Sequence, residues 1–486
     1  MGNLNLRIFI FALAVIVFLL PVAACSSAQN EAIRDDSALK AQQDIRVASP
    51  EEVPGTSPIE SPEEQSLMRT LTISQCWDFG GHHSLDFAIE RFKSIHPDVE
   101  IILTNFRGDS QRYYAQVPML LMTGAADDII EWHWRFSYAD FADRGYLVDM
   151  KTLMRNDPDF NEDDWFVNVF RATKYRGGLY VLPLSFSFEM IGVNSTVSDE
   201  LTRRFKQFDM ISHRQLLDLY KEFNFTGNHF ISPTIDAANV IIHDFGRIVD
   251  FETNTANFNS DEFIRLISDA RYASNPQRIE LGFVGNWASL LTVADWANQI
   301  ELSYDYLFSN FLLNTQYEVF FPHAEDEIFT HFIPLATCDG EMIITSIRQF
   351  FVNSASENQE LAWEFLKFLT TDEVLTANEM NFGIPVNRHM FDAHAATFLT
   401  QYVERQRNLP GFADVSAETS DIVNRIIYHA ERYFEKSMHN YNIFRDVRIV
   451  EMIIENMTAF HNGMLTAEMV ADDLQNRVSL YLMERG

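Results

Sequence analysis

From residue 71 onward, short stretches with the hydrophobic pattern of strands alternate with longer stretches that have the pattern of helices. Three short runs rich in apolar and β-branched residues predict strands: 71–76, 99–103 and 128–132. Two intervening runs with apolar residues every three or four positions predict helices: 85–95 and 110–122. Ser84 is the expected N-cap of the first helix, Pro97 stops it, and Gly124 ends the second. This β-α-β-α-β order predicts a parallel sheet whose carboxyl strand ends lie on one edge, where ligands of open α/β sheets bind.

The second half of the chain is expected to be more helical. Ser356 and Gln359 have the spacing of a capping box at the start of a helix over 357–370. Thr466 begins a final amphipathic helix. The apolar stripe of that helix consists of Val470, Leu474, Val478 and Tyr481. The pattern as a whole is that of an α/β protein whose helices become more frequent toward the C-terminus.

The sequence EWHWRF, residues 131–136, comes at the end of the third expected strand, on the sheet edge that would also carry Asp78. Sugar rings offer apolar C–H faces to aromatic planes and hydroxyls to polar side chains, so tryptophans beside acids and arginines suit a carbohydrate site. The candidate rings are Trp77, Trp132 and Trp134, with Trp287 or Trp296 facing them from the second half. The alternative is that these rings are core residues, as most of the 41 phenylalanines must be.

Length and charge narrow the range of functions. A chain of 486 residues is too long for one core, so two or three lobes are expected. The chain carries 69 acidic and 37 basic residues, a formal net charge of −32 at pH 7. Such a chain repels nucleic acids and anionic lipid surfaces, so no nucleic-acid partner is expected.

The first 25 residues have the pattern of a signal peptide. Arg7 gives a small basic region, and residues 8–20 form an apolar run that is too short for a final membrane helix. The run leads into Val22-Ala-Ala-Cys25, which resembles the lipobox of bacterial lipoproteins. That resemblance implies cleavage after residue 24 and attachment of acyl chains such as palmitate to Cys25. An ordinary secreted signal followed by a chance cysteine is the alternative.

The stretch that follows the apolar run is expected to be a tether. Residues 25–69 combine the lipidated cysteine with a flexible acidic segment rich in Ser, Glu, Ala and Pro, which would hold the folded part away from the membrane. Of the three cysteines, Cys76 and Cys338 then remain for the folded part. They could pair in an oxidising compartment, although two free thiols are the commoner outcome.

Several short segments, in order along residues 71–486, resemble the extracellular solute-binding proteins (family 1) of ABC importers. The likeness is to the carbohydrate-binding branch that includes maltose-binding proteins. The matching segments are 122–130, 141–149, 177–194, 333–340, 358–369, 383–387 and 463–484. The clearest of them reads NQELAWEFLKFL, over residues 358–369. Each segment is short, but their order behind a lipobox makes the resemblance specific.

The resemblance implies a type II periplasmic-binding-protein-like α/β fold, in which two lobes joined by hinge strands close over one solute. The first crossing between lobes is expected near 184–191. The implied parts are a signal peptide (1–24), the tether (25–69), lobe 1 (70–184 and 334–385) and lobe 2 (185–333 and 386–486). The resemblance further implies a monomer without cofactor or enzymatic activity, which delivers a sugar or oligosaccharide to ABC permease subunits at the outer face of the cell membrane.

Roles for individual residues are also implied by the resemblance. The segment around EWHWRF is similar to one that holds the sugar in maltose-binding proteins, and this places Trp132 and Arg135 on ligand-contacting positions. Asp78 falls on an acidic ligand position, and Ser187 falls on a ligand glutamate of the first hinge strand. The aspartate that precedes the arginine in those proteins is missing here, which implies a solute other than maltose.

Metal binding and catalysis are competing interpretations. His82-His83 and the Glu131-x-His133 pair lack the spacing to a third and fourth ligand, and His133 in a strand would point away from the neighbouring tryptophans. No G-x-S-x-G, H-E-x-x-H or P-loop motif occurs in the sequence. Two alternatives to an importer protein stay open: an extracellular glycosidase or lyase, and a sensor that presents its solute to a receptor.

Overall fold

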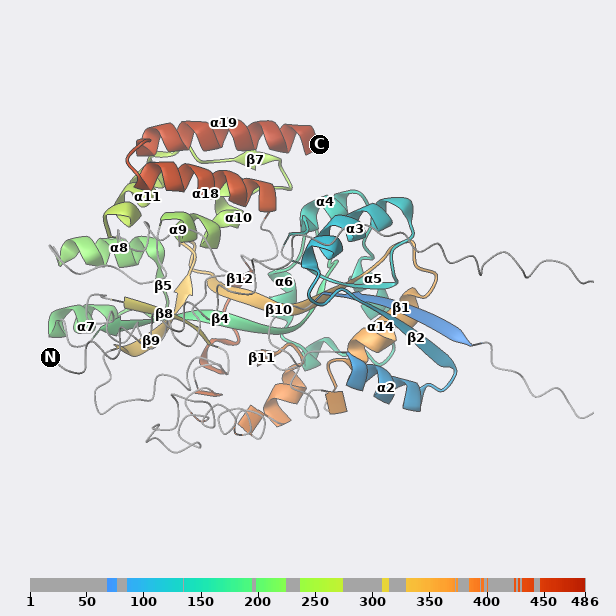
Figure 1. Ribbon diagram of the computed structural model, residues 1–486. Helices are drawn as coiled ribbons and strands as arrows, with labels where there is room; N and C mark the ends of the chain where they lie inside the picture. The colour runs from blue at the N-terminus through green and yellow to red at the C-terminus, as the bar shows by residue number, and fades with distance from the viewer. Residues whose placement is uncertain are drawn as a thin grey trace, which may run out of the picture. The chain divides into compact units, whose positions relative to one another are not determined.

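A computed structural model shows a mixed sheet of ten strands with helices on both of its sides (Figure 1). The structure describes the following residues and a few isolated positions between them: 68–76, 85–133, 135–194, 198–223, 237–273, 308–313, 329–371, 384–393, 431–440 and 446–485. All of these ranges belong to one unit, Ser66–Gly486. The predicted signal peptide, Cys25 and residues 26–67 of the predicted tether lie outside the described residues. The last residue assigned to the tether, Arg69, is instead the first residue of a strand. Within the ranges given, no helix is long and apolar enough to cross a bilayer.

The strand order of the sheet is β11-β4-β9-β10-β3-β1-β2, with β12 beside β10, β5 beside β9 and β8 beside β4. The strands are β1 (Arg69–Gln75), β2 (Val99–Asn105), β3 (Ile129–Glu131), β4 (Leu182–Asn194), β5 (Ile211–Ser212), β8 (Phe308–Leu313), β9 (Phe329–Ala336), β10 (Met342–Val352), β11 (Ile384–Pro385) and β12 (Met438–Asn440). A separate two-stranded sheet consists of β6 (Val249–Asp250) and β7 (Thr255–Ala256).

The N-terminal part of the sheet is parallel, as the sequence predicts. β1 pairs in parallel with β2 along its whole length and with β3 near its carboxyl end. The connecting helices are α2 (Asp86–Ile95) and α3 (Ser110–Thr123), and α3 ends at Gly124, whose φ of +70° suits glycine. The run expected to form the first helix has Leu85, Ala88, Phe92 and Ile95 at its apolar positions, but Ile95 is 47% exposed and Ile89 is buried.

Two long strands connect the parallel strands to the rest of the sheet. β10 pairs in turn with β12 at its start, with β4 in its middle and with β3 at its end. β4 runs antiparallel to β10 and continues beyond it to pair with β8 and β9. We call β4 and β10 the crossing strands. The expected crossing near 184–191 falls inside β4, while the division of the chain into two lobes stays a prediction.

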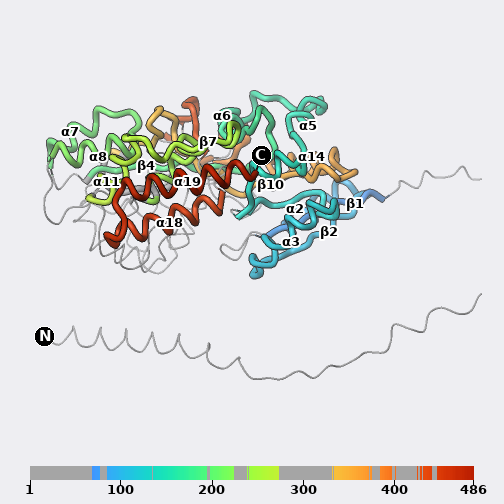
Figure 2. Tube along the Cα trace, turned by 90° about the horizontal axis from the view of Figure 1, so that it is seen from above, coloured from blue at the N-terminus to red at the C-terminus, as the bar shows by residue number. Residues whose placement is uncertain are grey.

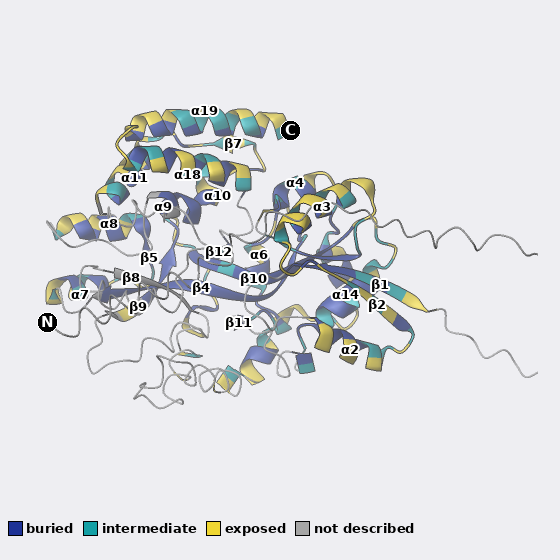
Figure 3. Cartoon of the chain, viewed as in Figure 1, coloured by how far each residue is buried: buried dark blue, intermediate teal, exposed yellow. Residues whose placement is uncertain are grey.

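The C-terminal helices α18 (Val447–His461) and α19 (Ala467–Arg485) lie side by side (Figure 2). The prediction that Thr466 begins the last helix is confirmed, because its Oγ1 accepts a hydrogen bond from the amide of Met469 at 3.3 Å. Three members of the predicted stripe, Val470, Leu474 and Val478, are fully buried. The fourth, Tyr481, is only half-buried, and the neighbouring Leu482 is fully buried instead. Figure 3 shows the buried face of α19 turned toward α18 and its exposed face turned outward.

The remaining helices are shorter and pack around the sheet (Figure 1). They are α4 (Tyr138–Asp143), α5 (Met150–Asn156), α6 (Val167–Arg171), α7 (Asp199–Phe205), α8 (His213–Glu222), α9 (Ala237–His243), α10 (Phe245–Ile248), α11 (Asp261–Ala273), α14 (Gln359–Phe368) and the 3₁₀ turn Glu162–Asp164.

The capping box predicted at Ser356 is wrong. The helix there, α14, begins at Gln359, and its N-cap residue Asn358 makes no side-chain cap. The hydroxyl of Ser356 accepts a hydrogen bond from the amide of Asn358 at 3.0 Å and donates to the carboxylate of Asp128, which also accepts hydrogen bonds from the amide and the hydroxyl of Thr72. Ser356 therefore fixes the entry to β3, because a buried carboxylate needs donors more than an exposed helix end does.

Both cysteines in the described part of the chain are free thiols. Cys76 is buried at the end of β1, where its Sγ lies 3.9 Å from the carbonyl oxygen of Phe106. The Sγ of Cys338 lies 3.6 Å from Asp244, and burial raises the pKa of Cys338 to about 11. The alternative of a disulfide between them is therefore not realised.

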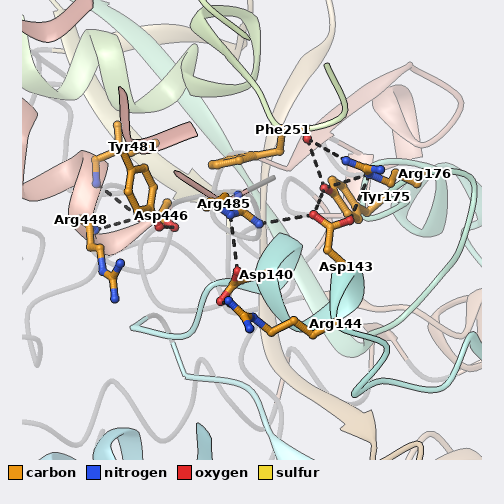
Figure 4. Close-up of polar contacts among 11 residues, drawn as sticks. Asp140, Asp143, Arg144, Tyr175, Arg176, Phe251, Asp446, Arg448, Tyr481 and Arg485 are labelled. Carbon is orange, nitrogen blue, oxygen red and sulfur yellow. Dashed lines mark hydrogen bonds and ion pairs between the residues drawn. The ribbon is translucent and has the colours of Figure 1, made fainter. Parts of the chain in front are cut away.

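A cluster of charged side chains joins α4 to the end of α19 (Figure 4). We call it the Asp143 cluster, and its members are Asp140, Asp143, Tyr175, Arg176 and Arg485. The carboxylate of Asp143 accepts a hydrogen bond from Tyr175 at 2.8 Å and forms ion pairs with Arg176 at 3.1 Å and Arg485 at 3.6 Å. Arg485 also lies 3.5 Å from Asp140. The backbone amide of Arg176 also donates a hydrogen bond to the side chain of Glu252, in the turn between β6 and β7. The cluster therefore joins four segments that are distant in sequence: α4, the loop at 175–176, the β6–β7 turn and the end of α19.

Candidate solute site on the crossing strands

The register of the crossing strands places polar side chains on one face. Thr345 lies opposite Ser187, Ile347 opposite Ser185, and Gln349 opposite Pro183. Directly opposite residues of paired strands project to the same face, and so do residues two apart along a strand. The odd-numbered residues of this part of β10 therefore share a face with Ser185 and Ser187.

Trp132 extends this face at the carboxyl end of β3. Its backbone amide donates to the carbonyl oxygen of Gln349 at 2.7 Å, which continues the register of the β3–β10 pair by one residue. We call Trp132, Ser185, Ser187, Thr345 and Gln349 the polar strip. Thr345 and Ile347 are the only half-buried residues of β10, so this is the face on which the strand is least covered.

Two polar atoms of the strip are buried and have no hydrogen-bond partner among the residues that the structure describes. One is the indole Nε1 of Trp132, which is a donor, and the other is the side-chain Oε1 of Gln349, which is an acceptor. The other side-chain atom of Gln349, Nε2, donates to the carbonyl oxygen of Ser346 at 3.2 Å. Buried polar groups are nearly always paired in proteins, so each of these two atoms needs a partner, either a bound solute or a buried water molecule.

The opposite face carries a buried ion pair. The Nε of Arg348 lies 3.2 Å from the Oε1 of Glu131, and both side chains are 3% exposed. The second carboxylate oxygen of Glu131 accepts a hydrogen bond from the amide of Cys76 at 2.8 Å, and Arg348 contacts Gln75 at 3.4 Å. The pair therefore ties the ends of β1 and β3 to the middle of β10.

Arg348 also has an unusual backbone. Its φ is +48°, in the left-handed region that residues other than glycine rarely adopt. Burial lowers the pKa of Arg348, and the charge of Glu131 acts in the opposite direction. A strained backbone and a buried charge at one residue indicate that the surroundings determine its position, at the point where β10 passes from β4 to β3.

The structure brings together two of the predicted site residues, Trp132 and Ser187, on the polar strip. Arg135 lies elsewhere: it is exposed, and its guanidinium carbon sits 4.5 Å from the ring centroid of Tyr114 on α3. His133 lies beyond β3 rather than in a strand, and its ring stacks on Tyr114 with centroids 5.8 Å apart. The other predicted residues, Trp77, Asp78, Trp134, Trp296, Trp287 and His82-His83, lie outside the described residues.

Sequence reasoning missed Gln349 and Arg348 and gave Glu131 no role beyond a possible metal ligand. A pattern for the first two is visible, since TSIRQ (345–349) interrupts the apolar strand MII…FFV. Polar residues are uncommon inside a strand that pairs on both sides, so this interruption indicates that they have a specific role. No three His, Cys, Asp or Glu side chains gather as a metal site in the ranges that the structure covers.

A second buried polar group lies away from the strip. Glu189 of β4 has its Oε1 3.3 Å from the Nε2 of His243, and the Nδ1 of His243 lies 3.1 Å from the Nε2 of His213. All three side chains are at most 1% exposed. Burial lowers the pKa of His213, and the neighbouring His243 lowers it further. His213 is therefore held in its neutral form in the folded protein.

Comparison with known proteins gives matches at the level of structure alone. No protein-family model matches the chain, and no curated protein sequence does. The sugar-binding protein MalE from the phytopathogen Xanthomonas citri matches with a TM-score of 0.58 and 12% identity, over 86% of this chain and 98% of that one. The ABC substrate-binding protein Lmo0181 from Listeria monocytogenes, in complex with cycloalternan, matches with a TM-score of 0.51 and 14% identity, over 85% and 99%.

The chain has the type II periplasmic-binding-protein-like fold. The predicted fold class is thus confirmed, and solved structures of this fold include many solute-binding proteins for sugars. A de novo designed cysteine esterase, ECH19, also matches, with a TM-score of 0.59 and 12% identity over 86% of this chain and 99% of that one. This solute-binding fold is therefore found with a designed catalytic function too, so the function has to be argued from the site.

Proposed function

We propose that the protein captures a small solute, a sugar or an oligosaccharide, and delivers it to an ABC importer without altering it chemically. The observation that carries the proposal is the polar strip, where an indole ring and hydroxyl and amide side chains share one face beside the carboxyl ends of β1 and β3. Ligands of open α/β sheets bind at such strand ends. Sugar-binding structures with this fold support the choice of solute class.

In this proposal Trp132 provides the stacking surface. The ring is half-buried and packs against the core on one side, which leaves the rest of its surface for a sugar. Stacking on one indole together with burial of the sugar's C–H face contributes about 1–3 kcal/mol. Truncation to alanine would then weaken binding about ten- to hundredfold.

Binding is tested with thermal-shift and tryptophan-fluorescence titrations against a panel of maltotriose, cellotriose, xylotriose and trigalacturonate. We expect at least one member to raise the midpoint of thermal unfolding. Trp132→Ala should then lose most of the affinity, while Trp132→Phe, which keeps a ring, should retain part of it. Tyr272→Ala, at a ring that is 66% exposed, is the control and should bind as the unmodified protein does. Unchanged affinity in Trp132→Ala would contradict the stacking role.

The absence of catalysis is tested on the same samples. After prolonged incubation with the tightest-binding trisaccharide, chromatography should recover the sugar intact. Release of shorter sugars at a rate proportional to protein concentration would favour the glycosidase or lyase instead.

We further propose that Cys25 carries the lipid anchor at the outer face of the cell membrane. The support is the sequence Val22-Ala-Ala-Cys25 after an apolar run of signal-peptide length. The full-length protein should be found in the membrane fraction and carry an acyl mass on Cys25. Cys25→Ser should leave the protein unprocessed and without acyl chains, whereas normal processing of that variant would contradict lipidation.

A further inference from the structure

We infer that Gln349 is a specificity-determining residue, which reads a hydroxyl group of the solute through its side-chain oxygen. The inference rests on the proposed function, because it requires a solute against the polar strip. It adds the chemical character of the group that is held there: a hydroxyl of an uncharged part of the solute, rather than a carboxylate or an ammonium.

The side chain of Gln349 is fixed by its own contacts. Its Nε2 donates to the carbonyl oxygen of Ser346, and this bond decides which end of the amide is the nitrogen. Its backbone carbonyl accepts from the amide of Trp132, which holds the two residues next to each other. The residue is 2% exposed, and its side-chain oxygen is buried. The Oε1 atom is therefore an acceptor in a set position to which no described residue supplies a donor.

An unpaired acceptor at a buried position is costly. Leaving a buried polar group without a hydrogen bond costs the full desolvation of that group, and its neighbour Trp132 has an unpaired donor on the same face. One of these atoms is an acceptor and the other is a donor, and they belong to residues that lie next to each other across the two strands. A single class of ligand can satisfy both.

A hydroxyl-rich solute satisfies both atoms. A hydroxyl group can donate to the Gln349 oxygen, and a hydroxyl or ring oxygen can accept from the Trp132 indole. A carboxylate has no proton to give to Gln349, and an ammonium has no lone pair for the indole N–H. The strip itself contributes no charged side chain to balance an ionic group. The nearby guanidinium of Arg348 belongs to the opposite face, where its Nε lies against Glu131 and its Nη2 against Gln75, while its Nη1 has no hydrogen-bond partner among the described residues.

A buried water molecule between the two residues is the competing explanation. Such a water would also accept from the indole and donate to the amide oxygen. In that case Gln349 would contribute to stability but not to the choice of solute. The two explanations therefore differ in whether a change at Gln349 alters the ranking of solutes.

The experiment measures dissociation constants by calorimetry for the trisaccharide panel above, with the unmodified protein and with Gln349→Met. The methionine keeps the length and volume of the side chain and removes the acceptor. We expect the unmodified protein to bind at least one neutral trisaccharide at least tenfold more tightly than trigalacturonate. We expect Gln349→Met to lose at least fivefold in affinity for that neutral trisaccharide. The ratio of its affinities for the neutral trisaccharide and for trigalacturonate should therefore be smaller than in the unmodified protein.

Gln116→Met, at an exposed position of α3, is the matched control and should leave all affinities unchanged. If Gln349→Met is less stable than the unmodified protein but binds every sugar with an affinity within twofold of it, the buried water is the correct explanation and the inference is overturned. The inference would also be overturned if the unmodified protein bound trigalacturonate more tightly than every neutral sugar. This measurement does not depend on the folding of any variant. Binding of no panel member at all would instead overturn the proposed function, and the inference with it.

Discussion

Two of the ion-pair groups in the described part of the chain, the Arg348–Glu131 pair and the Asp143 cluster, differ mainly in how much water reaches them. The Arg348–Glu131 pair on the crossing strands is 3% exposed on both sides. In the Asp143 cluster, Arg485 is 7% exposed while Asp140 and Asp143 are about one-third exposed. The buried pair joins two side chains and is supported by a hydrogen bond from the backbone amide of Cys76, whereas the Asp143 cluster consists of several contacts between four segments (Figure 4).

The comparison shows that similar residues have different consequences in the two places. In the interior, attraction between charges is strong but the loss of hydration is larger, so a broken pair is much worse than no pair. At the half-exposed site, water and salt replace much of what a lost partner supplied. Arg348 should therefore be needed to hold the strand ends beneath the polar strip, and the Asp143 cluster should contribute modestly to joining α4 with α19.

The largest effect is expected from breaking the buried pair on one side only. Arg348→Met leaves the carboxylate of Glu131 buried without its cation, and we expect the free energy of unfolding to fall by about 3–5 kcal/mol in urea titrations. In the double variant Arg348→Met with Glu131→Gln, the charge is removed and the acceptor for the Cys76 amide is kept. The double variant should recover part of the lost stability. A double variant no more stable than the single one would show that the pair acts mainly by packing.

The next largest effect is expected from His213, which is buried in its neutral form and makes stability depend on pH. The pKa of His213 is lowered in the folded protein, so the unfolded chain binds its proton more tightly. Stability from this group is fully present above about pH 6.5 and is lost as the pH falls below that value, at about 1.4 kcal/mol per pH unit. Urea titrations from pH 7 to pH 4.5 should show a shallower pH dependence for His213→Gln. His389→Gln, at an exposed histidine, is the control and should keep the original dependence.

A smaller effect is expected at the half-exposed cluster. Asp143→Asn weakens three contacts at once, with Tyr175, Arg176 and Arg485, yet we expect a loss of only about 1 kcal/mol in the free energy of unfolding. The difference from the unmodified protein should shrink in about 0.5 M NaCl, because salt screens exposed charges. The loss in Arg348→Met should change little under the same conditions. If the stability losses of Asp143→Asn and Arg348→Met depended equally on salt, water access would not distinguish the two sites.

The smallest effect is expected at a fully exposed pair. Arg203 and Glu200 form an i, i+3 ion pair on α7, with side chains 67% and 49% exposed. Arg203→Gln should change the free energy of unfolding by less than about 0.5 kcal/mol. This variant sets the baseline against which the two clusters are compared, and a loss above 1 kcal/mol would show that exposure does not rank the pairs.

The sequence by itself determined the parallel β2-β1-β3 unit, because hydrophobic period, Pro97 and Gly124 are local features. It also determined the final helix from Thr466, whose buried stripe has a strict helical spacing. The placing of Trp132 at a strand end followed from the same local pattern together with the rule that parallel strands end on one edge. These elements depend on neighbours within a few residues, so the chain reveals them directly.

The tertiary structure alone decided which polar residues share a face. Gln349 lies more than 200 positions after Trp132, and only the pairing of β10 with β3 and β4 brings it beside Trp132 and Ser187. The same holds for the hydrogen bond from Ser356 to Asp128, since the two residues are more than 200 positions apart and Asp128 lies just before β3. Register between distant strands is set by the burial of whole faces and not by local propensity, so no single stretch of sequence encodes it.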